Sequence, residues 1–311
     1  MTQPASPATT TAAHLKPAYA ALVLGALGMG MSPLFVRFAA EAGVGPYASG
    51  FWRMFLALPF LWVWARIEEG GGPAKPTFHK PMTWAGLLFS CDLFFWHLSI
   101  LRTSIANATF LSTTAPIWVL LVSVVVLKEK VKPATLGGLA LCLLGGSSLV
   151  GNTLSLAPER LLGDVFGLLT AVFFGLYFFG IKYARDLSGA GRSTFAASAV
   201  ASAVLLVVSL ATNDQLIPST LKGAASLLLM AMISQALGQG LLSVALGRLP
   251  TVFSALVIFL EAVAAAALAW IVLDEALSPL QWLGGGLILC GIFIARPRTA
   301  DKHQESDHDR D

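Results

Sequence analysis

Two acidic residues stand inside long apolar stretches of the sequence. Glu261 lies 11 residues into the stretch 250–273, and Asp92 lies near the middle of the stretch 81–101. An ionisable group in such a stretch is costly and usually faces a cavity or a partner. Glu261 could contact a cation or carry an exchangeable proton, because a poorly hydrated carboxyl group resists ionisation. The alternative for Glu261 is a neutral, hydrogen-bonded packing residue.

An aromatic residue shares a helical face with Asp92. Trp96 follows Asp92 by four residues, so both side chains project from one side of a helix. An acid beside an aromatic ring could hold an ammonium group by charge and cation–π attraction; the alternative is an Asp92 buried against a Ser, Thr or Arg partner. His97 points about 140° away from that face, and we expect it to make a structural hydrogen bond rather than to relay protons.

Four further polar residues are candidates for the wall of a cavity. Gln235 and Gln239 are four residues apart on one stretch, where they would either hydrogen-bond a solute or join neighbouring helices. Arg53 could bind a carboxylate, pair with Asp92 or extend its charged end toward the membrane surface. Tyr177 would line the same cavity or pack against neighbouring helices.

One stretch, 104–127, combines small polar residues with a proline near its centre. Asn107 and Thr114 share a helical face in this stretch, together with Leu111 and Trp118. The proline follows Thr114 by two residues, and it would either loosen the helix beside a cavity or only kink it. We therefore count Asn107 and Thr114 among the candidate binding residues.

Long apolar blocks dominate the composition of the chain. Of its 311 residues, 56% are hydrophobic and 12% are charged, against about 25% charged in a soluble domain. Blocks of about 20 apolar residues are long enough to cross a bilayer as helices, whereas barrel strands would alternate apolar and polar residues. The sequence predicts ten transmembrane helices, the first kinked at Pro33, over residues 17–40, 46–65, 81–101, 104–127, 133–150, 163–184, 192–212, 222–246, 250–273 and 279–295.

A shift of 146 residues aligns the second half of the chain with the first. It carries a tripeptide, a proline and two glycines onto their counterparts: Leu127-Lys128-Glu129 onto Leu273-Asp274-Glu275, Pro133 onto Pro279, Gly138 onto Gly284 and Gly145 onto Gly291. Ten helices then form two sets of five, and because five is odd the second set crosses the membrane in the opposite direction. We expect an all-α integral membrane fold of two inverted five-helix repeats, residues 17–151 and 163–296, joined by a loop at 152–162.

The basic residues are distributed unevenly between the two sides that this topology defines. Fifteen of the 20 lysines and arginines fall on the side of the N-terminus, four fall on the other side, and Arg53 lies within a helix. Cytoplasmic loops of membrane proteins are enriched in Lys and Arg, so the N- and C-termini are expected in the cytoplasm. The segments 1–16 and 297–311 are polar or rich in Thr, Ala and Pro, and we expect both to be disordered.

These patterns resemble the drug/metabolite transporter superfamily, EamA type. The resemblance rests on Arg53, on residues 104–116 with Glu129 and Pro133, and on the second copy at residues 250–260, Glu275 and Pro279. It implies a ten-helix carrier with a central cavity, in a family of which many members export amino acids or other small metabolites. The resemblance implies no ATP-driven step, and the sequence has no GxxxxGK[ST] motif.

The sequence thus predicts a secondary transporter of a bacterial inner membrane, an exporter of an amino-acid-like solute whose two repeats rock about a midplane cavity. Alternatives are an uncoupled facilitator or exchanger and a membrane subunit that does not transport. An enzyme is disfavoured, because no cluster of catalytic His, Asp or Lys residues stands near a membrane surface.

The expected partners are a small-molecule substrate and membrane lipid. Protons remain an open choice of coupling ion, and a monomer and a homodimer remain alternatives. We expect no nucleic-acid partner, no cofactor and no metal site. The three cysteines, Cys91, Cys142 and Cys290, lie in apolar blocks without the spacing of metal ligands.

Overall fold

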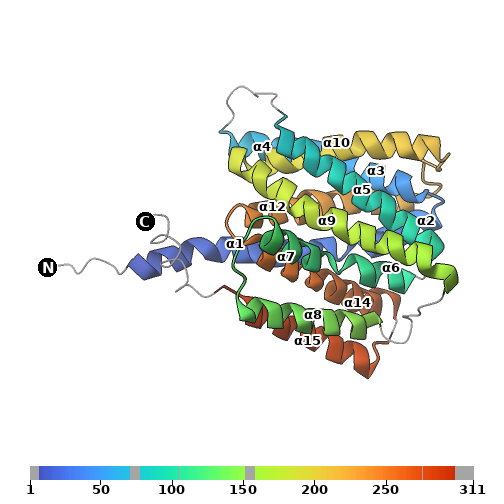
Figure 1. The fold of residues 1–311 in the computed structure, drawn as a ribbon. Helices are drawn as coiled ribbons and strands as arrows, with labels where there is room; N and C mark the ends of the chain where they lie inside the picture. Colours follow the sequence, from blue (N-terminus) through green and yellow to red (C-terminus); the bar gives the residue numbers. More distant parts are fainter. Residues whose placement is uncertain (1–6, 71–77, 104, 151–157, 275, 298–311) are drawn as a thin grey trace.

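The computed structural model has only helices as regular elements and describes residues 7–70, 78–103, 105–150, 158–274 and 276–297. Figure 1 shows these helices running side by side in one bundle. α1 (Pro7–Met29) begins on the side of the bundle where α15 (Pro279–Ala295) ends. On that side the Tyr19 hydroxyl donates a hydrogen bond to the carbonyl oxygen of Pro297 at 3.5 Å. The two ends of the described chain therefore lie on one face of the bundle.

The elements follow one another in two halves. The first half comprises α1, α2 (Ser32–Glu41), α3 (Pro46–Phe55), α4 (Leu58–Glu68), α5 (Lys80–Arg102), α6 (Ile105–Ser112), α7 (Ala115–Val125) and α8 (Pro133–Val150). The second half comprises the 3₁₀ turn η2 (Pro158–Arg160), α9 (Leu161–Leu187), α10 (Ala190–Ala211), α11 (Leu221–Leu229), the π-helix η3 (Met230–Gln239), α12 (Gly240–Leu246), α13 (Thr251–Val257), α14 (Phe259–Leu273) and α15.

Seven described helical segments are long and apolar enough to cross a membrane, by length and composition. Two shorter apolar helices accompany them, Phe110–Val125 and Pro279–Ala295. The expectation of an all-helical membrane protein is confirmed for the described residues, but the count of ten spans is not. The expected span 46–65 consists of two short helices, α3 and α4.

The N-terminal helix starts earlier than the sequence suggested. Residues 1–6 and 298–311, for which we expected disorder, lie outside the described part of the chain. Residues 7–16 belong to α1, which continues through Pro17. This segment contains several alanines, and alanine is the strongest helix former. The expected loop 152–162 is described only from residue 158 onward, where η2 leads into α9.

Four of the expected helices are broken near their middles. The breaks separate α1 from α2, α3 from α4, α6 from α7, and α13 from α14. In the first three cases a proline stands in the first turn of the second piece, namely Pro33, Pro59 or Pro116. Proline has no N–H group and cannot extend the hydrogen-bond ladder of the preceding helix. The kink expected at Pro33 is therefore a complete break.

The fourth break has no proline. α13 ends before Ile258, whose carbonyl oxygen accepts a hydrogen bond from the Glu261 N–H at 2.8 Å. This three-residue spacing is tighter than that of an α-helix. The shift of 146 residues carries Ser112, at the end of α6, onto Ile258, so the two breaks occupy equivalent places in the two halves.

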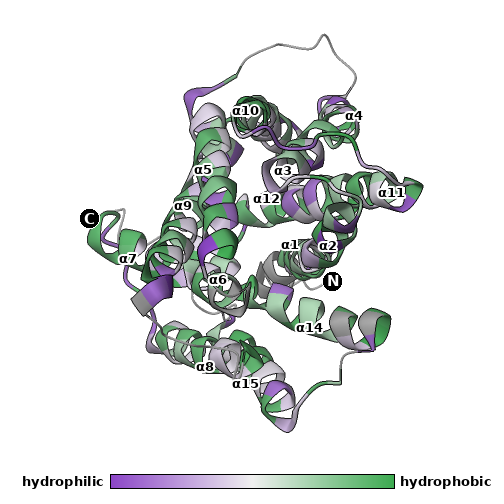
Figure 2. Cartoon of the chain, turned by 90° about the vertical axis from the view of Figure 1, so that its right-hand side faces the viewer, coloured by the Kyte–Doolittle hydropathy of each residue, from purple (hydrophilic) through white to green (hydrophobic). Residues whose placement is uncertain are grey.

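The two halves meet through α8 and α15, which lie side by side in Figures 1 and 2. A Cβ atom added to Gly138 would lie 2.5 Å from the Gly291 carbonyl oxygen, and one added to Gly145 would lie 2.5 Å from the Gly284 carbonyl oxygen. Only glycine permits such close packing of two membrane helices. The pairing runs antiparallel, and the shift of 146 residues exchanges the two contacts. A two-fold axis across the helices produces this pattern, so it supports inverted repeats.

Two carboxylates also join the halves, one at each end of the contact between α3–α4 and α10. The Glu68 carboxylate accepts hydrogen bonds from the N–H groups of Ala190 and Gly191, at 3.2 and 2.8 Å. The Asp214 carboxylate accepts them from Tyr47 and Ala48, at 2.7 and 3.0 Å. Each acid belongs to one half and satisfies the orphan N–H groups at a helix start of the other half. We call these two contacts the cross-repeat caps; the shift of 146 residues carries Glu68 onto Asp214.

Removing either cross-repeat cap is expected to destabilise the fold. Glu68→Ala or Asp214→Ala leaves two N–H groups at a helix start without their acceptor, and loss of a helix cap costs about 1 kcal/mol. Unfolding of the purified protein in detergent by heat or denaturant measures the loss. Glu41→Ala is the control, because Glu41 makes only exposed ion pairs with Arg37 and Lys222, which contribute little. An equal loss in all three variants would contradict the capping role.

Candidate functional site

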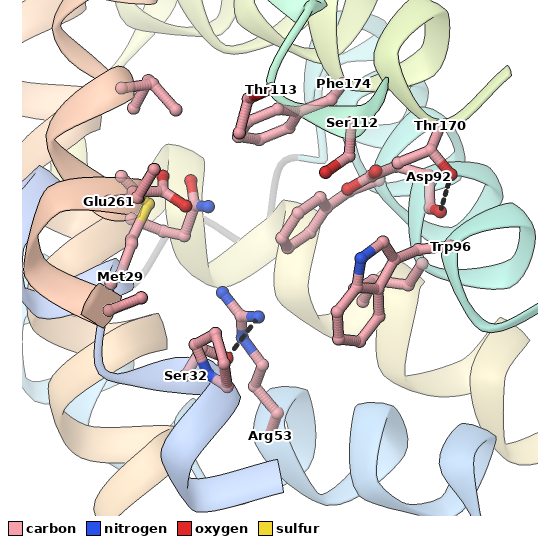
Figure 3. Close-up of a pocket in the computed structure, with 18 residues that line it drawn as sticks. Met29, Ser32, Arg53, Asp92, Trp96, Ser112, Thr113, Thr170, Phe174 and Glu261 are labelled. Carbon is pink, nitrogen blue, oxygen red and sulfur yellow. Dashed lines mark hydrogen bonds between the residues drawn. The ribbon is translucent and has the colours of Figure 1, made fainter. Parts of the chain in front are cut away.

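A cavity lies where the broken helices approach one another in the middle of the bundle. Its empty volume is about 860 Å³, including the space at its open mouth. Its polar lining comes from seven elements and one helix break (Figure 3): Ser32, Arg53, Asp92, Trp96, Ser112, Thr113, Thr170, Gln239 and Glu261. Its apolar lining includes Met29, Phe89, Phe174 and Ile258.

Helix ends provide part of the cavity wall. The end of α1 and the start of α2 contribute Met29 and Ser32, the end of α6 contributes Ser112, and the start of α14 contributes Glu261. A helix end leaves backbone N–H or C=O groups without partners inside the helix. At membrane depth such ends are tolerated where they face protein or a water-filled cavity. The broken helices and the cavity are therefore consistent with one another.

Burial changes along α13 and α14 at the level of the cavity. Every residue from 251 to 260 is buried, whereas every residue from 261 to 268 is only partly buried. The change falls at the start of α14, where Glu261 and Ala262 line the cavity. This change favours a mouth toward the C-terminal end of α14, which is the side that Figure 2 views.

Glu261 offers an unused hydrogen-bond acceptor. Its Oε1 atom is buried and has no hydrogen-bond partner among the described residues. The start of α14 packs closely against the break between α1 and α2 at this point, because a Cβ atom on Gly30 would lie 2.7 Å from the Glu261 carbonyl oxygen. A buried polar atom without a partner is costly. Such an atom on a cavity wall is suited to contact a solute.

Asp92 presents a second carboxylate from the opposite wall. The residue is 6% exposed and lies on α5. Its backbone carbonyl oxygen accepts a hydrogen bond from the Thr170 hydroxyl at 3.4 Å, whereas its carboxylate makes no hydrogen bond or ion pair within the described structure. Trp96, four residues later, lines the cavity beside it (Figure 3), as their shared helical face predicts.

Arg53 is held by neutral partners. Its Nε donates to the Gln235 side-chain oxygen and its Nη1 donates to the Ser32 hydroxyl, both at 3.1 Å. The guanidinium carbon lies 5.7 Å from the centre of the Phe89 ring. In Figure 3 the guanidinium lies between the walls that carry Glu261 and Asp92. The suggested ion pair with Asp92 is not formed, because Ser32 and Gln235 orient the arginine instead.

The two glutamines of the π-helix have different tasks. Both polar atoms of the Gln235 side chain are hydrogen-bonded, since its oxygen accepts from Arg53 and its Nε2 donates to the Ser198 hydroxyl at 3.0 Å. Gln235 does not line the cavity. Gln239 lines the cavity, and its side-chain oxygen accepts a hydrogen bond from the Tyr177 hydroxyl at 3.0 Å. The amide nitrogen of Gln239 makes no hydrogen bond within the described structure, so it remains a donor. π-helical segments are rare and frequent at functional sites.

Tyr177 does not line the cavity but packs behind residues that do. It is 1% exposed, and its ring stacks on that of Phe89 with 4.7 Å between the ring centres. Phe174, one turn earlier on α9, does line the cavity. Tyr177 therefore positions Gln239 and supports the aromatic wall.

His97, Thr114 and Asn107 do not belong to the described lining. The Nδ1 atom of His97 lies 2.7 Å from the Leu93 carbonyl oxygen, the structural hydrogen bond that we favoured. The Thr114 hydroxyl donates to the Leu111 carbonyl oxygen at 2.6 Å. The helical face assumed for residues 107–118 ends at the break between α6 and α7, which turns Ser112 and Thr113 to the cavity instead. The side chain of Asn107 lies outside the described part of the chain.

Several lining residues carry weak sequence signals. Ser32 stands directly before a proline in an apolar stretch, and Thr113 stands three residues before one. A small polar residue beside a helix-breaking proline could have identified both. Thr170 and Phe89 have no such signal. Among the described residues, no group of three His, Cys, Asp or Glu side chains could hold a metal ion.

Loss of the Tyr177 hydroxyl is expected to destabilise the protein. Tyr177→Phe leaves the buried side-chain oxygen of Gln239 without its donor, which costs about 1–3 kcal/mol. Thermal unfolding in detergent measures the change. Tyr183→Phe provides the control, because Tyr183 is 45% exposed and lies outside the lining of this cavity. If both variants unfold at the same temperature as the original protein, the Tyr177–Gln239 hydrogen bond does not stabilise the fold.

A family model and a solved structure resemble the chain. The model of the EamA-like transporter family matches residues 16–150 and, a second time, residues 161–296. A solved structure, described only as "Crystal structure of protein", superposes with a TM-score of 0.77 and 15% sequence identity. The match covers 89% of this chain and 96% of the other. At that identity the likeness concerns the fold alone. No curated protein matches the chain in sequence.

Proposed function

The chain belongs to the EamA-like transporter family, and on this premise we propose that it is a secondary transporter that exports a small amino-acid-like solute. The family match covers both halves of the chain, confirms the resemblance to the drug/metabolite transporters and makes the protein a multi-pass membrane transporter. The observation that carries the finer proposal is the set of unused polar groups on the cavity wall: Glu261 Oε1, the Asp92 carboxylate and the Gln239 amide nitrogen.

An amino acid would use groups of both signs in this cavity. Its carboxylate would meet Arg53, whose Nη2 makes no hydrogen bond within the described structure, and the Gln239 N–H. Charge-assisted bonds of this kind are the strong ones. Its ammonium group would meet Glu261. An apolar or aromatic side chain would pack against Phe174 and Trp96.

Alternating access requires that the closed side of the cavity opens when the mouth closes. The sequence predicts that the two repeats rock about a midplane cavity. The cross-repeat caps hold α3–α4 against α10 at both ends, and glycine contacts hold α8 against α15. The proposed movement is therefore a bending of α2, α6 and α14 at their breaks, beside helix pairs that stay together.

We place the protein in a bacterial inner membrane, and the distribution of basic residues favours both termini in the cytoplasm. The cavity mouth then faces the outside, and the closed side faces the cytoplasm. After Cys290 is replaced by serine, Lys222→Cys is expected to react with a membrane-impermeant maleimide in intact cells. Lys130→Cys is expected to react only in permeabilised cells. If Lys130→Cys reacts in intact cells and Lys222→Cys does not, both termini face the outside instead. Both lysines are exposed in the structure.

The function is tested by efflux of labelled amino acids from proteoliposomes, with and without an imposed pH gradient. We expect release of one class of amino acid and its loss, by about tenfold or more, in Glu261→Gln, because one unpaired charge partner is worth at least 1.4 kcal/mol. Glu41→Gln, at an exposed site, is the control. A rate set by the gradient would indicate proton coupling, and a rate independent of it an uncoupled facilitator.

Two results would contradict the proposal. If folded protein releases no amino acid, the protein is not an amino-acid exporter, and its solute belongs to another chemical class. If release continues unchanged in Glu261→Gln, the solute passes through another part of the molecule.

A further inference from the structure

The described cavity wall carries three ionisable side chains, and their charges do not cancel. Arg53 is the single base, and Asp92 and Glu261 are the two acids in the lining. Arg53 uses two of its donor groups on the neutral side chains of Ser32 and Gln235. No ion pair joins it to either acid within the described structure. With all three groups ionised, the empty site holds one negative charge in excess.

The two acids stand on different walls, so they cannot both serve one ammonium group. Glu261 projects from the start of α14, Asp92 projects from α5, and the Arg53 guanidinium lies between them (Figure 3). A zwitterionic amino acid has one carboxylate for Arg53 and one ammonium for one acid. The other acid would then remain in a poorly hydrated site without a counter-charge, which is unfavourable.

We propose that the solute is an amino acid whose side chain ends in a second ammonium group. Such a molecule brings one negative and two positive charges and therefore gives each of the three wall charges a partner. This inference rests on the proposed transport function and names the class of its substrate. It assigns Asp92 as the residue that selects for the second charge.

The surroundings of the two acids favour one orientation. Near Asp92 the wall is aromatic, with Trp96, Phe89 and Phe174 in the lining. Aromatic faces pack against a chain of methylene groups and attract a terminal ammonium by cation–π interaction. Near Glu261 the wall is formed by small or narrow residues such as Ala262 and Ala265. The α-ammonium group therefore belongs at Glu261, and the side-chain ammonium belongs at Asp92.

A proton on one acid would give the same neutral total with a neutral amino acid. That arrangement differs from the proposal in two measurable ways. It predicts no preference for a second ammonium group. It also predicts either uptake of one proton with the neutral amino acid or, where the empty site already holds that proton, its release when lysine binds.

The test is calorimetric binding of L-lysine and L-norleucine to the purified full-length protein at pH 7. Norleucine has the same four side-chain carbons as lysine and no second ammonium group. We expect lysine to bind about tenfold more tightly or better, since one added charge pair of 1.4 kcal/mol gives a factor of ten. Asp92→Asn is expected to abolish this difference by weakening lysine alone, whereas Glu261→Gln weakens both and Glu41→Gln weakens neither.

The comparison of the two ligands on the unaltered protein does not depend on whether a variant folds. Equal binding of lysine and norleucine would overturn this inference and leave the proposed amino-acid site intact. Buffers of different ionisation enthalpy then show whether a proton is taken up on binding or is already present in the empty site. Binding of neither ligand would overturn this inference, and it would overturn the proposed function as well if the proteoliposomes release no amino acid.

Discussion

Backbone hydrogen bonding is the constraint that shapes this molecule, because a bilayer core offers no water to an unpaired N–H or C=O group. All regular elements of the described chain are helices for this reason. Where a helix is broken, the freed backbone groups need another outlet. Three of the four breaks, those of α1–α2, α6–α7 and α13–α14, contribute residues to the cavity. The cavity is thus a consequence of where the helices stop.

The second shaping interaction is the arrangement of Arg53 among neutral partners. Ser32 and Gln235 fix the guanidinium from α2 and η3, so neither acid of the cavity is used to hold it. An arginine paired with Asp92 would have cancelled one charge and reduced the capacity of the wall for a charged solute. The hydroxyl of Tyr177 has a similar effect, because it occupies the oxygen of Gln239 and leaves the nitrogen as a donor. Hydrogen bonds to neutral partners therefore leave the two carboxylates and the Gln239 nitrogen free to contact a solute.

The sequence predicts the architecture better than the wall of the cavity. Apolar block length, the 146-residue shift and the proline at 33 predict the helices, the two repeats and one of the breaks. Glu261 and Asp92 are detectable because a charge inside an apolar block is conspicuous.

The faces of the helices are harder to predict. The shared face predicted for residues 107 to 118 requires a continuous helix. The proline at 116 predicts a loosened or kinked helix, but the complete break before Ala115 invalidates that face. No proline near Ile258 predicts the break at that position. Gln235 and Gln239 look equivalent in sequence, and only their partners, Arg53 and Tyr177, distinguish them. Contacts between helices distant in the sequence decide these points, and no local pattern records them.

The cross-repeat caps also have a consequence for biogenesis. The start of α3 is complete only when Asp214 is present, and this residue follows Tyr47 by 167 positions. A ribosome therefore delivers α3 to the membrane long before it has made the acceptor for its first N–H groups. α10 has no such delay, since Glu68 precedes it in the chain. The two halves thus mature asymmetrically. The first half waits for the second, and neither half is a finished folding unit when it is separated from the other.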